Sequence, residues 1–262
     1  MPRIGQTSSP YQLYNCDCFE LFAKLKSQSV DLVLVDPPYG TTGCKWDSVI
    51  PLAPMWKEIE RVLKPRAAVL VFSSQPFSSL VVASNLNWYK YSWIWEKPQG
   101  ANFLNFKFQP SKVHEEILVF GDGATSFSKL GNNLAYYPIM EQGDPYHIKK
   151  HGVGNAVARD AKTRNNKTIE TINSGTRYPK SVLKYALDRS GWHPTLKPVD
   201  LVGYLVKTYS RPGGLVLDFA MGSGTTGVAC GRLGRRFIGC DNDVEHGYFE
   251  TAQRRIKEAY GA

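Results

Sequence analysis

The sequence lacks the long apolar runs that a membrane-spanning helix needs. Its longest apolar stretches, such as residues 67–72, are far shorter than the roughly 20 residues that cross a bilayer. The first ten residues, MPRIGQTSSP, contain no apolar core and do not resemble a signal peptide. Internal repeats and low-complexity tracts are also missing. The 262 residues are enough for one buried core, and their composition is ordinary for a globular protein.

Cysteine is scarce and carries no metal-binding spacing. The five cysteines, Cys16, Cys18, Cys44, Cys230 and Cys240, form no CxxC pair and no Cys/His zinc pattern. We therefore expect reduced thiols in an intracellular protein, and no metal site is implied.

Acidic residues are outnumbered, since 32 Lys and Arg stand against 23 Asp and Glu, a net charge of +9. The excess is uneven, because residues 141–189 hold ten basic and five acidic side chains. Such a segment attracts a polyanion such as nucleic acid, but a solvated surface can have the same composition. Charge alone leaves both interpretations open.

Short apolar runs alternate with helix-length segments, a pattern that favours an α/β layer architecture. Residues 32–35 and 68–72 are near-continuous apolar runs, typical of buried parallel strands. Further strands are predicted at residues 11–14, 91–95, 117–120, 215–219 and 236–240, and helices at residues 18–25, 55–63, 198–209 and 246–260 and directly after a glycine turn at 222–224.

The periodicity fades between residues 121 and 191, a stretch rich in Gly, Asn, Thr, Lys and Arg. A loop of this length is uncommon inside a compact domain. We therefore expect either a small appended module or a functional insert there.

The stretch VLDFAMGSGTTGVAC sets Gly222, Gly224 and Gly227 in a GxGxxG spacing between a predicted strand and helix. Glycines allow a tight turn and a close approach of a ligand to the backbone, and the helix start presents free N–H groups. Asp241 ends the next strand, where a ribose-binding acid belongs. The pattern suits a nicotinamide or flavin dinucleotide and equally S-adenosylmethionine, while a purely structural turn is the simpler alternative.

The stretch DLVLVDPPYG ends a buried strand at Asp36 and continues with Pro37, Pro38 and Tyr39. The two prolines remove N–H donors and stiffen the backbone, so the turn presents acceptors only, beside an aromatic ring. Two acceptors on an exocyclic amino group would make its nitrogen a better nucleophile and stabilise the positive charge that develops during methyl transfer. An ordinary proline-rich turn is the alternative.

Together these residues resemble the DNA amino-methyltransferase family. Asp36-Pro37-Pro38-Tyr39 resembles its catalytic motif, DFAMGSGTTG its S-adenosylmethionine loop, and HPTLKP its third cofactor element. The catalytic motif precedes the cofactor loop, which is similar to the permuted β class of N6-adenine and some N4-cytosine enzymes. The resemblance covers nearly the whole chain.

The resemblance implies a Rossmann-like, mostly parallel sheet of seven strands in a single domain, with residues 121–191 as an inserted target-recognition region. It also implies S-adenosylmethionine as the cofactor. The residues expected to bind that cofactor are Asp17, His193, Thr195, Lys197, Asp218, Phe219, Gly222, Ser223, Gly224, Thr225 and Asp241. Helix capping is the alternative for Asp17, and simple packing is the alternative for His193.

The resemblance further implies double-stranded DNA as partner, with the target base flipped out of the duplex. Trp95 and Lys97 are then candidates for the target-base pocket, although a Trp at a strand end often belongs to the core. Phosphate contacts are expected from Lys149, Lys150, Arg159, Lys162, Arg164 and Lys167. The family implies a cytoplasmic, nucleoid-associated enzyme of bacterial or phage origin, for which a homodimer and a cognate restriction enzyme are compatible partners.

One position departs from the family pattern, because Ala220 stands where many members carry phenylalanine. The acid at Asp36 favours adenine N6 as the target, because family members that methylate cytosine N4 usually carry serine at this position. Four other functions remain as alternatives: a cytosine-N4 enzyme, an RNA adenine methyltransferase, a catalytically silent DNA-binding protein and a nicotinamide oxidoreductase. The last leaves Asp36 to Tyr39 and the basic segment unexplained.

Overall fold

The seven strands predicted from the sequence all join one large sheet. The structure is a computed structural model that describes residues 9–41, 47–101, 103–129, 131–150, 169–188, 190–191, 196–242 and 246–261. Its strands are β1 (Tyr11–Asn15), β2 (Val30–Val35), β3 (Leu63–Ser73), β4 (Tyr89–Ala101), β5 (Lys112–Phe120), β6 (Glu141–Gln142), β7 (Tyr146–Lys150), β8 (Ile169–Asn173), β9 (Thr176–Arg177), β10 (Val182–Lys184), β11 (Leu215–Asp218) and β12 (Arg236–Asp241). Its helices are α1 (Cys18–Lys24), α2 (Leu52–Val62), α3 (Phe77–Ser84), α4 (Val199–Tyr209), α5 (Thr225–Arg232) and α6 (Tyr248–Ala259), with single 3-10 turns at Phe103–Asn105 and Phe127–Lys129.

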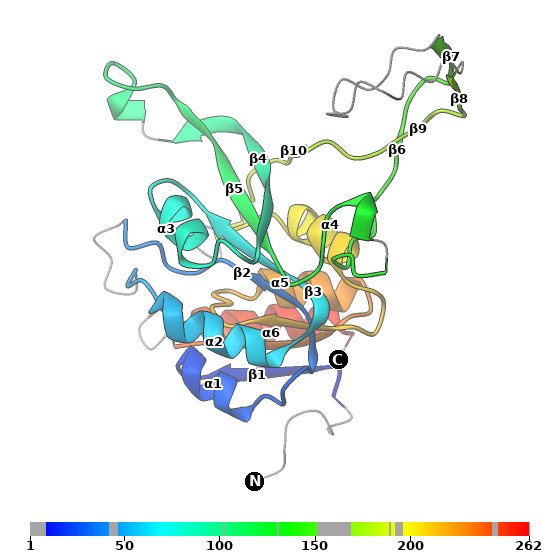
Figure 1. Ribbon diagram of the computed structural model, residues 1–262. Helices are drawn as coiled ribbons and strands as arrows, with labels where there is room; N and C mark the ends of the chain where they lie inside the picture. Colours follow the sequence, from blue (N-terminus) through cyan, green and yellow to red (C-terminus); the bar gives the residue numbers. More distant parts are fainter. Residues whose placement is uncertain are drawn as a thin grey trace. The chain divides into compact units, whose positions relative to one another are not determined.

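The large sheet has eight strands in the order β1-β12-β11-β2-β3-β5-β4-β10 (Figure 1). Neighbouring strands are parallel except for β5, which runs antiparallel to both β3 and β4. The predicted fold class, a mostly parallel α/β sheet, is confirmed. The strand β10 is an addition to the seven that were expected, and it comes from the segment where periodicity fades.

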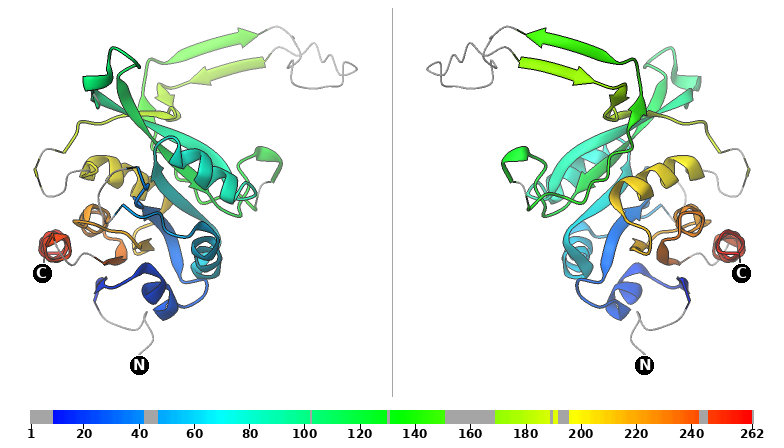
Figure 2. Two further views of the ribbon diagram at one scale, coloured as in Figure 1. Left: turned by 90° about the vertical axis from the view of Figure 1, so that its left-hand side faces the viewer. Right: turned by 90° about the vertical axis from the view of Figure 1, so that its right-hand side faces the viewer.

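Side chains of one strand alternate between two hydrophobic cores, one on each face of the sheet. On β2, Leu32 and Leu34 pack with α4, α5 and α6, whereas Val33 and Val35 pack with α1, α2 and α3. Figure 2 shows helices on both sides of the strands. None of the described helices combines the length and the apolar character that crossing a membrane requires.

Residues 138–180 form a second compact unit with two small antiparallel strand pairs, β6 with β9 and β7 with β8. Within it, the Arg177 guanidinium lies 4.7 Å from the centroid of the Tyr146 ring and donates to the Asn173 side-chain oxygen. The unit lies inside residues 121–191, and β10 belongs to the larger unit. A target-recognition role for this region stays a prediction.

The glycine turn before α5 is shaped by close packing. A Cβ atom on Gly227 would lie 2.4 Å from Ile256 Cδ1 on α6 and 2.8 Å from Phe237 Cε1 on β12, too close for either contact. Gly227 therefore allows α5 to approach its neighbours, and this third glycine of the motif serves the fold.

We expect Gly227→Ala to lower the free energy of unfolding by about 1–3 kcal/mol, because the added methyl group overpacks a filled interface. Chemical denaturation measures the change. Gly203→Ala in α4 is the matched control, since a Cβ there meets only Leu233 Cδ1 at 3.8 Å and alanine favours a helix by up to about 1 kcal/mol. Equal losses in the two variants would contradict the packing explanation.

Candidate active site

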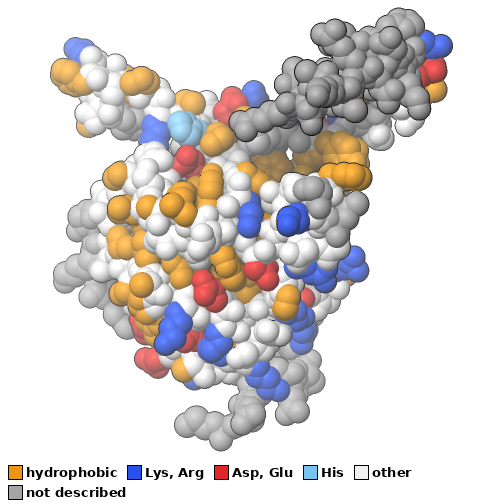
Figure 3. Space-filling view, viewed as in Figure 1, with side chains coloured by type: hydrophobic (Ala, Val, Ile, Leu, Met, Phe, Trp, Pro, Cys, Tyr) orange, Lys and Arg blue, Asp and Glu red, His pale blue; other side chains and the backbone are white. Residues whose placement is uncertain are grey.

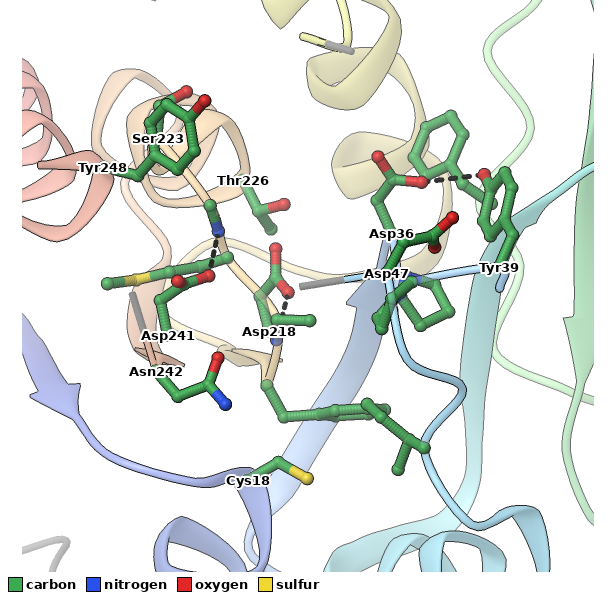
Figure 4. Close-up of a pocket in the computed structure, with 18 of the residues that line it drawn as sticks. Cys18, Asp36, Tyr39, Asp47, Asp218, Ser223, Thr226, Asp241, Asn242 and Tyr248 are labelled. Atoms are coloured by element: carbon green, nitrogen blue, oxygen red, sulfur yellow. Dashed lines mark hydrogen bonds between the residues drawn. The ribbon is translucent and has the colours of Figure 1, made fainter. Parts of the chain in front are cut away.

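Four neighbouring parallel strands end at one edge of the sheet, and an acidic residue stands at or just beyond each end. Asp17 and Asp36 follow β1 and β2, while Asp218 and Asp241 are the last residues of β11 and β12. All four line one cavity of about 590 Å³. Figure 4 shows three of them, Asp36, Asp218 and Asp241, around this cavity. Ligands of open α/β sheets bind at the carboxyl ends of parallel strands, so this cavity is the candidate site.

The glycine turn forms one wall of the cavity. The Gly222 N–H donates to Asp241 Oδ2 at 2.7 Å, which ties the turn to the end of β12. Gly224, with φ of +83°, takes a left-handed conformation that glycine adopts freely, and α5 begins at the next residue. Gly222, Ser223 and Thr225 line the cavity together with Asp241. The structure therefore brings these predicted cofactor residues together.

Asp218 is the most deeply buried of the four acids. Burial raises the pKa of Asp218 to about 7, although a hydrogen bond with Thr226 favours the charged form. Its Oδ1 accepts a hydrogen bond from the Ala220 N–H at 3.2 Å. This carboxyl therefore titrates near neutral pH, which is unusual for an aspartate.

The Asp-Pro-Pro-Tyr turn orients its acid through its own tyrosine. The Tyr39 hydroxyl donates to Asp36 Oδ1 at 2.8 Å, as Figure 4 shows. The Tyr39 ring stacks on Phe77 of α3 with centroids 5.1 Å apart and planes inclined by 20°. Burial, followed by the charge of Asp36, holds the pKa of Tyr39 well above its ordinary value. The phenol therefore stays a hydrogen-bond donor at physiological pH.

A second acid, Asp47, fixes the chain just beyond the turn. Its two carboxylate oxygens accept from the Gly40 N–H at 2.8 Å and from the Thr41 N–H at 2.9 Å. Asp47 is buried and lines the cavity. Its two hydrogen bonds hold the backbone directly after Tyr39 in place. The sequence offers no periodicity or motif at this position, and Asp47 was not among the predicted site residues.

Lys197 reaches Asp36 from just before α4. Its ammonium donates to Asp36 Oδ2 at 2.5 Å and lies 3.4 Å from Glu115 Oε2 on β5. Lys97 of β4 forms an ion pair with the other oxygen of Glu115. The side chains thus alternate in charge from Asp36 through Lys197 and Glu115 to Lys97.

The two central residues of this row of charged side chains, Lys197 and Glu115, keep their charges although they are largely buried. Burial alone would lower the pKa of Lys197, but Asp36 and Glu115 outweigh it and raise that pKa. Burial alone would also raise the pKa of Glu115, but Lys197 and Lys97 outweigh it and lower that pKa. Glu115 was not among the predicted site residues.

Two of the predicted cofactor residues have evident structural roles as well. Asp17 caps α1, because its Oδ1 accepts from the Phe19 N–H at 2.8 Å. Phe219 is buried and packs against Phe22 with centroids 5.2 Å apart. Both residues nevertheless line the cavity, so contact with a cofactor stays a prediction for each.

The two residues predicted for the target-base pocket lie on β4. Trp95 is buried, and its indole N–H donates to the Tyr185 carbonyl at 3.0 Å. The described residues that line the cavity include neither Trp95 nor Lys97. Lys97 instead pairs with Glu115 and lies 5.2 Å from the Trp95 ring centroid. Their contact with a base remains a prediction.

Several predicted residues cannot be placed. His193 and Thr195, expected near the cofactor, and Arg159, Lys162, Arg164 and Lys167, expected at phosphates, lie outside the described residues. Lys149 and Lys150 belong to β7, where the Lys149 ammonium lies 3.3 Å from Glu170 Oε1.

The cavity also holds side chains that the sequence analysis did not select. They are Cys16, Cys18, Thr226, Asn242, His246 and Tyr248, among others. His246 and Tyr248 stack with centroids 5.2 Å apart at the start of α6. Figure 4 shows Tyr248 among the residues that line the cavity. Ala220, the position that departs from the family pattern, also lines the cavity.

A family model described as DNA methylase matches residues 30–254. The chain belongs to the N6/N4 DNA methylase family. The match includes both the Asp-Pro-Pro-Tyr turn and the glycine turn, and the expected resemblance is confirmed. This DNA methylase therefore places its family motifs at the ends of β2 and β11, on one cavity.

Relatives in sequence agree with that assignment. The Type II methyltransferase M1.MboII of Moraxella bovis is 28% identical over 256 residues, covering 90% of this chain and 93% of that protein. The DNA adenine methyltransferase YhdJ of Escherichia coli K12 is 26% identical over 267 residues, covering 93% and 81%.

Two solved structures share the fold. The M1.HpyAVI–SAM complex has a TM-score of 0.59 at 23% identity and covers 94% of this chain and 99% of that one. The cytosine-N4-specific PvuII DNA methyltransferase has a TM-score of 0.64 at 14% identity and covers 97% and 93%. The fold is therefore shared with an enzyme that is cytosine-N4-specific.

The raised pKa of Asp218 predicts a specific dependence of stability on pH. The folded state favours the neutral carboxyl, so the stabilisation is complete below about pH 4 and is lost as pH rises through about 7. Asp218→Asn keeps a neutral acceptor for the Ala220 N–H. We therefore expect the variant to gain in melting temperature relative to the natural protein between pH 5 and pH 8.

Thermal unfolding without cofactor at both pH values measures this difference. Asp144→Asn, at an exposed position, is the control and should leave the pH dependence unchanged. A difference between Asp218→Asn and the natural protein that is the same at pH 5 and pH 8 would show that Asp218 does not titrate in this range.

Proposed function

We propose that this DNA methylase transfers a methyl group from S-adenosylmethionine to the exocyclic N6 of an adenine flipped out of double-stranded DNA. The observation that carries the proposal is the acceptor-only turn at the cavity. Asp36 presents a partly buried carboxylate there, Pro37 and Pro38 supply no N–H groups, and the Tyr39 ring stands beside the carboxylate.

The reaction requires an amine whose lone pair is withdrawn from the ring. A hydrogen bond from N6–H to Asp36 favours a tetrahedral nitrogen and stabilises its positive charge as the methyl group arrives. The Tyr39 ring offers a face on which a flipped base can stack. Positioning and charge stabilisation are therefore the work of the protein, and no covalent intermediate is needed.

The polar groups that line the cavity match those of S-adenosylmethionine. Asp241 suits the ribose hydroxyls, Asp17 suits the adenine amino group, and the backbone of the glycine turn suits the methionine end. Among the described charged residues of the lining, six acidic side chains stand against a single lysine, Lys197, and this excess favours a cationic molecule. When bound, S-adenosylmethionine would supply the methyl group from its sulfonium centre, which would leave as a neutral thioether, while the methylated amine would release one proton.

Cytosine N4 is the second candidate target, because it is also an exocyclic amine and because the PvuII enzyme shares the fold. The carboxylate of Asp36 favours adenine, since serine in its place is usual for cytosine N4. The relation to YhdJ, a DNA adenine methyltransferase, supports the same choice.

The remaining roles are proposals about the partner. Residues 138–180 would contact the DNA, with Lys149, Lys150 and the basic residues between them and Ile169 at phosphates. We further propose a homodimer and a cognate restriction enzyme as partners, and the similarity to Type II methyltransferases is compatible with both.

The test compares genomic DNA from cells that express the natural chain with DNA from cells that express Asp36→Asn, in a host without its own methyltransferases. Digestion to nucleosides and mass spectrometry quantify N6-methyladenine and N4-methylcytosine. We expect N6-methyladenine from the natural chain. For the purified Asp36→Asn protein we expect kcat to fall at least about 10²-fold, because one charge-stabilising group is lost. Binding of S-adenosylmethionine should be retained.

N4-methylcytosine in place of N6-methyladenine would overturn the choice of base. Neither mark, from a folded chain that binds S-adenosylmethionine, would overturn the DNA substrate and point to RNA or to a silent DNA-binding protein. Glu258→Gln, at an exposed position of α6 outside the cavity lining, should methylate like the natural chain.

A further inference from the structure

The acceptor that the target amine needs is already occupied. Asp36 accepts from Tyr39 at one oxygen, at 2.8 Å, and from Lys197 at the other, at 2.5 Å. The Lys197 ammonium also lies 6.0 Å from the centroid of the Tyr39 ring, on which the base is expected to stack. An incoming amino group would therefore meet the lysine at the place where it must bind.

Electrostatics makes this contact unfavourable for the reaction. The nitrogen that accepts the methyl group becomes positive, and a fixed ammonium at Asp36 both repels that charge and neutralises the carboxylate that should stabilise it. Lys197 also keeps its proton, because two carboxylates surround it in a buried site. The conflict is removed only if the ammonium moves away from Asp36.

Glu115 offers the lysine another acceptor close by. Its Oε2 atom is buried, lies 3.4 Å from the Lys197 ammonium and accepts no hydrogen bond from the described residues. Its Oε1 atom is held by Lys97. A small side-chain movement would thus bring Lys197 into hydrogen-bonding contact with an oxygen that otherwise lacks a donor.

We propose that Lys197 is a positioning residue that holds Asp36 while the pocket contains no base and passes to Glu115 when the target amine binds. Lys97 keeps Glu115 in place to receive it. This inference rests on the proposed methylation of a flipped base and assigns Lys197 a role toward Asp36, beyond the cofactor contact expected from the motif.

Glu115→Gln tests the transfer, because it weakens the second acceptor and leaves Lys197 on Asp36. Glu116→Gln, at the next residue of β5, is the matched control; its carboxylate contacts the Gln75 side chain at 3.5 Å and not the network. The readouts are kcat and the fluorescence of 2-aminopurine placed at the target position of a duplex, which rises when that base is flipped. We expect Glu115→Gln to lower kcat about tenfold or more and to reduce the fluorescence rise, with the Kd for S-adenosylmethionine unchanged.

The double variant Glu115→Gln/Lys197→Met separates this role from simple structural damage. Without the ammonium, Asp36 is free, so the fluorescence rise should recover relative to Glu115→Gln alone. The transfer would be overturned if the natural chain methylates DNA and Glu115→Gln behaves like Glu116→Gln. It would also be overturned if the double variant gives a smaller fluorescence rise than Glu115→Gln alone. Absence of methylation by the natural chain would instead overturn the proposed function.

A different feature, the tip of the β4–β5 hairpin, carries a second inference. Between the two strands Phe103, Leu104, Phe106 and Phe108 are exposed by 72%, 78%, 48% and 87%. Figures 1 and 3 show this tip projecting from the body of the larger unit, with apolar side chains gathered on it. Large aromatic residues grouped in solvent at one loop indicate a binding surface.

The charge around the tip indicates which partner it fits. Residues 97–114 contain three lysines and no aspartate or glutamate. A second copy of the same surface would bring like charges together, whereas a polyanion with stacked aromatic bases complements both the lysines and the phenylalanines. The same hairpin carries Glu115 and Lys97 roughly 20 Å away along the strands, at about 3.3 Å per residue.

We infer that this tip inserts an aromatic side chain into the DNA duplex near the flipped base and stabilises the opened stack. Insertion of apolar side chains between base steps is a known physical means of distorting a duplex. The inference rests on DNA as substrate, and it assigns DNA contact to a segment outside the basic region at residues 141–189.

The test variant is Phe103→Ser/Phe108→Ser, in which neither position supports the core. Leu86→Ser, exposed by 66% after α3, is the matched control. We expect the Kd for a duplex with the target site to rise at least tenfold in the test variant. The rise should be smaller for a duplex already unstacked by an abasic site opposite the target, because less insertion is then needed. In parallel, analytical ultracentrifugation measures the molar mass of each variant in solution, which reports its oligomeric state.

Unchanged duplex affinity, or an equal loss for the intact and the abasic duplex, would overturn insertion. A fall in mass with unchanged affinity would identify the tip as a contact between copies of the chain and would overturn the inference as well. Methylation by the natural chain in the same assay separates these outcomes from failure of the proposed function.

Discussion

The parallel register of β1, β12, β11 and β2 is the constraint on which the site depends. Asn15 pairs with Asp241, Asp218 with Gly239 and Leu217 with Val33, so the four strands end within about two residues of one another. Acids that are far apart in the sequence therefore meet in one cavity. A shift of one residue in any strand would turn its last side chain to the opposite face and remove it from the site.

Gathering carboxyl groups in one cavity is unfavourable, and the protein compensates each one differently. Asp241 accepts the Gly222 N–H, Asp17 accepts an N–H at the start of α1, and Asp36 is paired with Lys197. Asp218, the most buried, instead has its pKa raised towards neutrality. The site is thus prepared for a cationic ligand, whose charge would offset what the backbone and Lys197 leave uncompensated.

The sequence predicts what local pattern determines and misses what distant segments bring together. Buried runs such as residues 68–72 lie in strands, and the glycine and Asp-Pro-Pro-Tyr turns lie at strand ends, because apolar continuity and backbone restriction act locally. Helix α3 was not predicted, because FSSLVVAS is rich in serine and valine, which favour helices weakly, and its stability comes from burying Phe77 and Val81. Asp47 and Glu115 have no local mark, since their partners are set only by the folded chain.

The turn that suits the reaction also explains why a remote lysine is needed. Pro37 and Pro38 leave no N–H beside Asp36, so backbone donors that satisfy the other acids are missing at this one. The carboxylate must therefore find its partners among side chains, and it takes Tyr39 from its own turn and Lys197 from 161 residues further along the chain. The Asp36 carboxylate can accept the target amine only if Lys197, which donates to it in the absence of a base, moves away. Glu115, 3.4 Å from that lysine, makes such a departure compatible with a buried charge.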